Sequence, residues 1–127
     1  MNIQKVAFGF FILLAMTLNF GFFYGEIDNP EHHNVYELFA AIVASLIATI
    51  LKLGERNQVG VVLLASTLVA DLQLISAAVV WAVAVHVMDV GLTPTVMASI
   101  VSLSGGALLA NLISAVLLTI ETSRMQR

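Results

Sequence analysis

The stretch from Val59 to Val87, VGVVLLASTLVADLQLISAAVVWAVAVHV, decides the fold. It is apolar almost throughout and holds a single carboxylate, Asp71. About 20 apolar residues are enough for a helix to cross the ~30 Å hydrocarbon core of a bilayer. Because lipid offers no partners to backbone groups, such a segment must be a helix or part of a closed barrel, and the period-2 alternation of a membrane barrel is absent. The stretch therefore predicts a membrane-spanning helix.

The rest of the chain repeats this pattern. Hydrophobic residues make up 60% of the 127 residues and charged residues 10%, whereas soluble domains carry about 45–50% and about 25%. We therefore predict an all-α integral membrane protein, an antiparallel bundle of four transmembrane helices. The first apolar stretch is longer than the ~7–15 residues of a cleaved signal core and no A-x-A-like site follows it, so we expect that helix to be retained. The prediction is one transmembrane domain, 1–127, with helices at about 5–24, 30–54, 58–88 and 94–122.

Helix-start signals divide the apolar segments. Asn29 is predicted to cap the second helix, with Pro30 in its first turn, and Thr93 to cap the fourth, with Pro94 in its first turn. The connections are short, so consecutive helices are expected to be antiparallel neighbours.

Charge sets the predicted orientation. The basic residues fall on one side of a four-helix threading: Lys5, Lys52, Arg56, Arg124 and Arg127. Basic loops stay in the cytoplasm. We therefore expect both termini to be cytoplasmic and the protein to lie in the plasma membrane as a multi-pass protein.

Asp71 is the main functional candidate, because it lies near the centre of its predicted helix. A charge at that depth costs about 2.5–3.5 kcal/mol on insertion scales unless it finds a partner or water, and such residues are functional by default. Asn111 lies at a similar depth on the fourth helix and is the predicted hydrogen-bond partner; Ser104 shares its face, and Gln73 lies about 200° around from Asp71. We predict that these four residues form an ion pathway. The alternatives are a structural buried acid for Asp71 and helix-packing roles for the other polar residues.

Small residues recur every four positions on two helices and predict close helix packing. They are Ala41, Ser45 and Thr49 on the second helix, and Ser102, Gly106 and Ala110 on the fourth. Gly105 with Gly106 has a second interpretation, a local unwinding that exposes carbonyl groups to an ion.

The loop GEIDNPEHHNVYE, residues 25–37, is strongly acidic. We predict an outer vestibule that concentrates cations and is formed by Glu26, Asp28, Glu31 and Glu37. His33 and Glu37 fall at i and i+4 of a helix beginning at Pro30, so a divalent metal site completed by Glu26 or Asp28 is a further possibility. His32 and His33 would make the mouth sensitive to mildly acidic pH. The alternative is a solvated acidic loop.

The segment NPEHHNVYELFAAIVASLIATILKLGER, residues 29–56, resembles an uncharacterised family of small four-helix bacterial inner-membrane proteins. The resemblance extends along the chain. It implies a bacterial inner-membrane protein of this topology, and it implies no activity and no site residue.

Two functions of different kinds follow from these observations. The first is a cation-conducting or proton-linked transport protein that works as a homo-oligomer, with monovalent or divalent cations or protons as cargo. The second is a non-conducting accessory subunit of a larger membrane transporter or channel, in which Asp71 pairs with a basic residue of the partner. The sequence has no nucleotide-binding loop, no H-E-x-x-H, no G-x-S-x-G and no run of basic residues. We therefore expect no enzyme activity, no cofactor and no nucleic-acid partner.

Overall fold

Four long helices make up the computed structural model, which describes residues 3–54 and 57–125, with side chains described up to Ser123. The helices are α1 (Ile3–Phe23), α2 (Val35–Lys52), α3 (Gln58–Ala82) and α4 (Pro94–Met125). A 3-10 turn, η1 (Pro30–His32), precedes α2, and a π-helical turn, η2 (Val83–Val87), extends α3. The spans Ile3–Phe23, Val35–Lys52, Gln58–Val87 and Pro94–Ser123 are each long and apolar enough to cross a membrane.

Capping residues explain where two of the helices begin. Thr93 accepts a hydrogen bond from the backbone N–H of Val96 at 3.2 Å, which confirms the predicted cap of α4. The predicted start of α2 was wrong. Asn29 and Pro30 begin the short turn η1, and α2 begins at Val35 after a second cap, Asn34, whose side chain accepts from Tyr36 N. Two asparagine caps five residues apart compete, and the later one starts the long helix.

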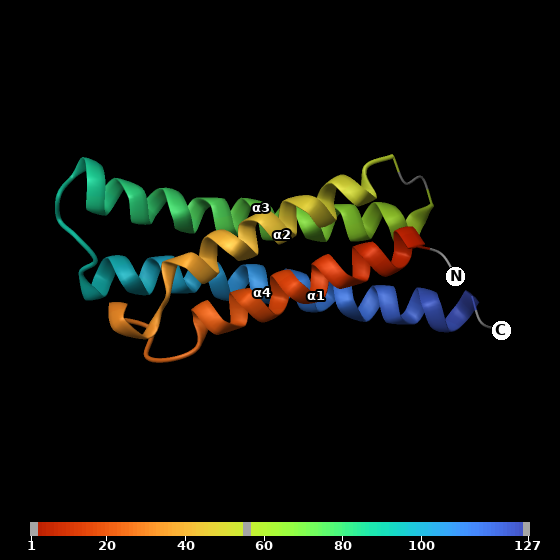
Figure 1. Cartoon of the computed structure of the whole chain (residues 1–127), viewed down its shortest axis with the longest axis horizontal. Coiled ribbons are helices and arrows are strands. Elements are labelled where there is room, and N and C mark those ends of the chain that lie inside the picture. Colours follow the sequence, from red (N-terminus) through yellow and green to blue (C-terminus); the bar gives the residue numbers. More distant parts are fainter. Residues whose placement is uncertain (1–2, 55–56, 126–127) are drawn as a thin grey trace.

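The helices form an antiparallel bundle in which consecutive helices pack against each other and α1 also packs against α4 (Figure 1). The beginning of α1 and the end of α4 therefore share one end of the bundle, which we call the terminal end. The opposite end carries the loop between α1 and α2 and the connection between α3 and α4, and we call it the loop end (Figure 1). The α4 helix is continuous through Gly105 and Gly106, so the alternative of a locally unwound segment is wrong.

Apolar side chains cover the outside of the bundle, while polar ones lie inside it. Large hydrophobic residues such as Leu13, Leu72 and Leu109 are more than half exposed. Polar side chains on every helix are buried, among them Asn19, Ser45, Asp71, Ser104 and Asn111. This distribution is the reverse of that in a water-soluble bundle, and it suits lipid as the solvent.

Candidate functional site

Asp71 of α3 points into the bundle and is only 6% exposed. Its two carboxyl oxygens contact two hydroxyl groups of α2. Ser45 Oγ donates to Oδ1 at 2.5 Å, and Thr49 Oγ1 donates to Oδ2 at 2.5 Å. Ser45 and Thr49 are one helical turn apart, so their side chains lie on one face of α2 and reach both oxygens at once. The buried acid is thus fully partnered within the chain.

The Thr49 hydroxyl has a second acceptor. Its Oγ1 also lies 3.0 Å from the backbone carbonyl oxygen of Ser45. A hydroxyl has one hydrogen to donate and two lone pairs that accept. Thr49 therefore donates either to Asp71 Oδ2 or to Ser45 O, and in the second case its oxygen remains free to accept.

Buried polar side chains lie close to the junction of two apolar clusters inside the bundle. The cluster at the loop end reaches Ala41 on α2 and Ala110 on α4. The cluster at the terminal end contains Ala48 on α2, and Ala115 of α4 packs against it. We define the central polar layer as the buried polar residues at this junction: Ser45, Thr49, Thr67, Asp71, Asn111 and Ser114.

Asn111 lies in this layer, but the prediction that it bonds to Asp71 is wrong. Its side chain is 0% exposed, and neither Oδ1 nor Nδ2 has a hydrogen-bond partner among the residues that the structure describes. The physical reason is direction: the Asp71 carboxyl group turns to the hydroxyls of α2, and Asn111 extends from α4. The two residues lie at a similar depth and therefore in the same layer, but their side chains do not form a hydrogen bond.

The other predicted pathway residues contact neighbouring helices. Ser104 of α4 pairs with Asn19 of α1: its hydroxyl donates to Asn19 Oδ1, and Asn19 Nδ2 donates to Ser104 O at 2.9 Å. Gln73 lies against Gly106 of α4, where an added Cβ would be 2.7 Å from Gln73 Oε1. Asp71 and Gln73 therefore face different helices, α2 and α4.

The small residues predicted to pack helices divide into two groups. Ala41, Ser45 and Thr49 are buried on α2, and Ala110 is buried on α4. Ser102 is exposed and lines a surface groove instead. Sequence reasoning assigned Ser45 and Thr49 to packing alone and missed their bonds to Asp71. The position of these residues along their helix could have indicated the bonds. Ser45 lies near the middle of its helix, as Asp71 does, and Thr49 follows one turn later.

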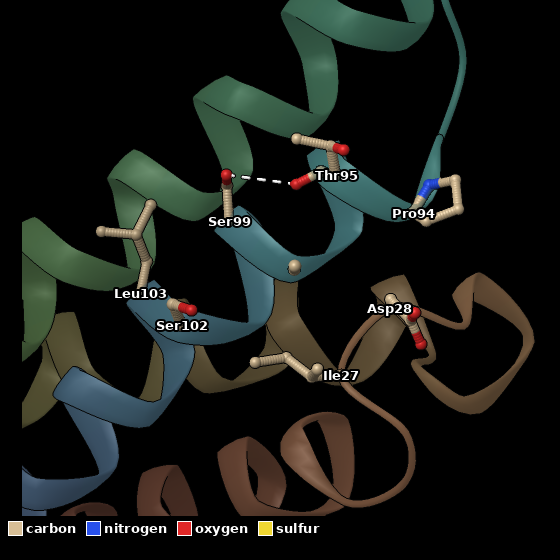
Figure 2. Close-up of a pocket in the computed structure, with 8 residues that line it drawn as sticks. Ile27, Asp28, Pro94, Thr95, Ser99, Ser102 and Leu103 are labelled. Atoms are coloured by element: carbon tan, nitrogen blue, oxygen red, sulfur yellow. Dashed lines mark hydrogen bonds between the residues drawn. The ribbon is translucent and has the colours of Figure 1, made fainter.

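The loop end carries the four predicted vestibule acids. Glu26, Asp28 and Glu31 are exposed, and Glu37 is half-buried with its carboxylate directly over the backbone of Gly21. Asp28 lines an open groove between the α1–α2 loop and the start of α4 (Figure 2). The α4 side of this groove offers hydroxyl groups and one large apolar side chain, from Thr95, Ser99, Ser102 and Leu103.

His33 joins the loop to the end of α1. Its Nδ1 lies 2.5 Å from Phe22 O and its Nε2 lies 2.6 Å from Glu26 O. A neutral imidazole has one N–H, and only the protonated ring donates through both nitrogens. With both ring nitrogens directed at carbonyl oxygens, His33 and Glu37 do not form the predicted metal pair. Within residues 3–54 and 57–125, no three histidine, cysteine or acidic side chains are grouped as a metal site.

Replacing His33 with phenylalanine is expected to loosen this loop and leave the bundle intact. The variant loses both contacts, and a hydrogen bond contributes about 1 kcal/mol net. Hydrogen exchange at the backbone amides of Asn29 and His32, which are bonded within the loop, should accelerate by about fivefold for the loss of one contact and by about thirtyfold for the loss of both. His86→Phe is the matched control, because His86 is exposed at the same end of the bundle. Unchanged loop exchange in His33→Phe would show that the ring does not hold the loop.

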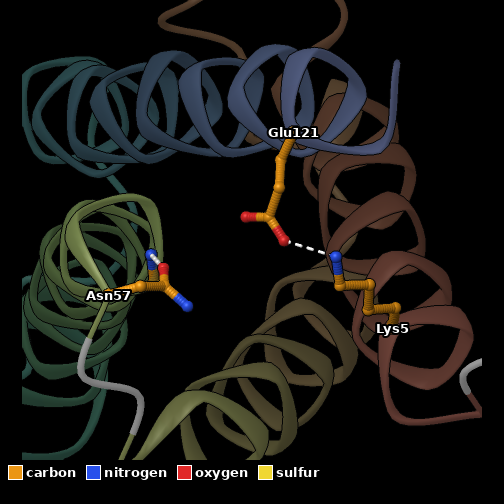
Figure 3. Close-up of polar contacts among 4 residues, drawn as sticks. Lys5, Asn57 and Glu121 are labelled. Carbon is orange, nitrogen blue, oxygen red and sulfur yellow. Dashed lines mark hydrogen bonds and ion pairs between the residues drawn. The ribbon is translucent and has the colours of Figure 1, made fainter. Parts of the chain in front are cut away.

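Two lysines lie at the terminal end. Lys5 of α1 forms an ion pair with Glu121 of α4, with Nζ 2.6 Å from Oε1 (Figure 3). Lys52 is 3% exposed, and its Nζ lies 4.5 Å from the centre of the Phe8 ring. Three more basic residues were used to predict the orientation. Arg56 and Arg127 lie outside the described residues, and only the backbone of Arg124 is described.

Together, the four apolar helices and the buried polar layer are typical of a multi-pass membrane protein. A family model, that of the family of unknown function DUF6394, matches residues 32–122. The chain belongs to this family. The matched part contains Asp71, its two hydroxyl donors and Asn111, whereas α1 with Asn19 lies before it. No curated protein and no solved structure matches the chain.

Proposed function

We propose that the protein is a proton-linked membrane transport protein, in which Asp71 takes up and releases a proton inside the helix bundle. The observation that carries the proposal is the position of the Thr49 hydroxyl, which lies within hydrogen-bond distance of both Asp71 Oδ2 and Ser45 O. This arrangement supplies partners to the acid in both of its protonation states.

The two states differ in the direction of two hydrogen bonds. When Asp71 is ionised, Ser45 and Thr49 both donate to it. When Asp71 is protonated at Oδ2, that O–H donates to Thr49 Oγ1, and Thr49 turns its own hydrogen to Ser45 O. Only hydroxyl rotation is required, so a proton enters or leaves without repacking of the helices. A purely structural acid needs partners for one state only.

The position of Asp71 favours a route through the bundle of one chain. A cation pore on the symmetry axis of a homo-oligomer would be lined by outward-facing residues, whereas Asp71 faces α2 and is 6% exposed. The proposal therefore favours protons over larger cations. Exposed acids at the loop end would raise the local cation concentration. Assembly as a homo-oligomer, the cytoplasmic side of both termini and a location in a bacterial inner membrane remain part of the proposal.

The alternative, an accessory subunit, receives less support. It requires the Asp71 carboxyl group to reach a basic side chain of a partner protein. Both carboxyl oxygens are already bonded to α2, and little of the side chain reaches the surface. Pull-down of a membrane partner by the native protein but not by Asp71→Asn, with no proton flux from either, would favour the accessory role.

Proton flux into liposomes tests the proposal. We expect the purified protein to dissipate an imposed pH gradient, measured with a trapped pH-sensitive dye, and Asp71→Asn to reduce the rate to that of protein-free liposomes. Asp89→Asn is the matched control, because Asp89 is exposed outside the bundle and its positive φ of 55° is tolerated by asparagine. Equal flux in native protein and Asp71→Asn, or none in either, would overturn the proposal.

Thr49 provides a second, independent prediction. Thr49→Val removes the hydroxyl at nearly constant shape, so the protonated form of Asp71 loses its acceptor and the ionised form loses a donor. We expect flux to fall strongly in Thr49→Val and to persist in Thr49→Ser, which keeps the hydroxyl. Native flux in Thr49→Val would show that the hydroxyl takes no part in proton movement.

A further inference from the structure

The side-chain amide of Asn111 is the most unusual polar group in the bundle. It is 0% exposed, and both its oxygen and its nitrogen lack a partner within the described chain. An amide has two N–H donors and an acceptor oxygen, and buried polar groups in native proteins are almost always satisfied by protein or by ordered water. The amide of Asn19, equally buried, is satisfied by Ser104.

Neighbouring polar groups on the same face of α4 are already engaged. Ser104, seven residues before Asn111, pairs with Asn19. Ser114, three residues after it, lies 2.5 Å from Ser66 Oγ on α3. These contacts engage the polar side chains nearest to Asn111 on this face, and its amide has no partner within residues 3–54 and 57–123, which points to a partner that is not part of the described chain.

The kind of partner follows from burial and charge. Complete burial excludes a side chain of another protein and a lipid headgroup. A single neutral amide is a poor site for a bare cation or anion, whereas water both donates and accepts and typically bonds to two to four groups when buried. On α3, the contacts of Ser66 with Ser114 and of Gln73 with Gly106 place the small buried residue Ala70 close to the level of Asn111, where it leaves more room than leucine or phenylalanine would.

The same level of the bundle contains Asp71. Two contacts between α3 and α4 bracket it: Ser66 with Ser114 on the side of the terminal end, and Gln73 with Gly106 on the side of the loop end. Asp71 and Asn111 both lie between these two contacts. A water held by Asn111 therefore occupies the layer in which the proposed proton carrier lies.

We propose that Asn111 binds a buried water molecule that relays protons to and from Asp71. This inference rests on the proposed function. In the relay, the Asp71 O–H turns from Thr49 Oγ1 to the water, its O–H bond breaks as the proton joins the water oxygen, and the resulting hydronium passes one of its other protons to a second water molecule, which the relay requires. The amide of Asn111 holds the water by one donated and one accepted hydrogen bond and undergoes no chemical change.

Solid-state NMR of the full chain in phosphatidylcholine liposomes detects the water directly. In protein with ¹⁵N-labelled asparagine, we expect magnetisation from water to reach the Asn111 side-chain NH₂ at short mixing times. The Asn19 side-chain NH₂ should receive no water magnetisation at those mixing times. Asn19 is the internal control because it is as buried as Asn111 and already bonded. The peak is assigned by its loss in Asn111→Ser, a small polar replacement, and in Asn111→Leu. If the Asn111 NH₂ receives no more water magnetisation than the Asn19 NH₂, the inference is overturned.

Proton flux tests the relay separately from the water site. Asn111→Leu fills the space with an apolar side chain and should lower the flux well below that of native protein, while Asn111→Ser retains part of it. Native flux in a folded Asn111→Leu protein overturns the relay even if the NMR signal is present. If native protein itself carries no flux, the proposed function and the relay both fail, while the NMR result still decides the water site.

Discussion

Removing both hydroxyls that donate to Asp71, in the double variant Ser45→Ala Thr49→Val, is expected to destabilise the bundle by about 2–4 kcal/mol. Each hydrogen bond to an ionised group contributes about 1.5–3 kcal/mol, and a buried group left without partners adds its own desolvation cost. The total destabilisation is limited because a carboxyl group that has lost its donors can be buried in its neutral, protonated form at a lower cost than as a charge. Unfolding in mixed micelles with increasing dodecyl sulfate, followed by circular dichroism, measures the change.

The matched background for this experiment is Asp71→Leu. Without the acid, the same two hydroxyl deletions remove no hydrogen bond to a carboxyl group, so their combined effect should be much smaller. The destabilisation by the two hydroxyl deletions in the native background, minus that in the Asp71→Leu background, is the coupling energy between the acid and the two hydroxyl groups. Equal destabilisation in both backgrounds would mean that Ser45 and Thr49 contribute through packing alone, as sequence reasoning first assigned them.

The second large effect is expected at Phe8 of α1, whose ring is 0% exposed in the terminal-end cluster. Phe8→Ala leaves a cavity that costs about 3–5 kcal/mol in soluble proteins. We expect the lower end of that range, because lipid or detergent replaces water around the unfolded helices and removes much of the hydrophobic term. The variant also removes the ring facing Lys52 Nζ, a contact worth about 2 kcal/mol when desolvated.

Phe10 on the same helix is the matched control, because its ring is 58% exposed. Phe10→Ala is expected to change stability by no more than about 0.5 kcal/mol, as surface substitutions usually do. The same micelle titration compares the two variants. If Phe8→Ala were no more destabilising than Phe10→Ala, the terminal-end cluster would not hold the helices together.

Much of the fold could be predicted from apolar length and caps. Each of the four predicted segments overlaps most of a helix that is long and apolar enough to cross a membrane, and Thr93 caps the fourth. The start of α2 could not be predicted, because Asn29 and Asn34 both carry valid cap chemistry. What decides between them is the extended backbone at His33, with φ −127°, and its ring contacts to two carbonyl groups. Those contacts exist only once α1 and the loop are in place.

The candidate site was predicted in part. Burial of Asp71 followed from its depth in an apolar run, but its partners depended on helix rotation. A turn of one helix by a fraction of its circumference decides whether an acid faces α2 or α4, and periodicity within one helix does not define that angle. For the same reason Asn111 was placed at the correct level and given the wrong partner. The hydroxyl pair of Ser45 and Thr49 resembled a packing motif because small polar residues serve both purposes.

Infrared difference spectroscopy of the protein in bilayers tests most directly whether Asp71 gains and loses a proton inside the bundle. We predict a carbonyl stretching band of a protonated carboxyl group that appears in acidic suspension and disappears in alkaline suspension. The band should be absent in Asp71→Asn and unchanged in Asp89→Asn. A spectrum in which no band depends on Asp71, or in which its band persists unaltered at both extremes, would contradict the account.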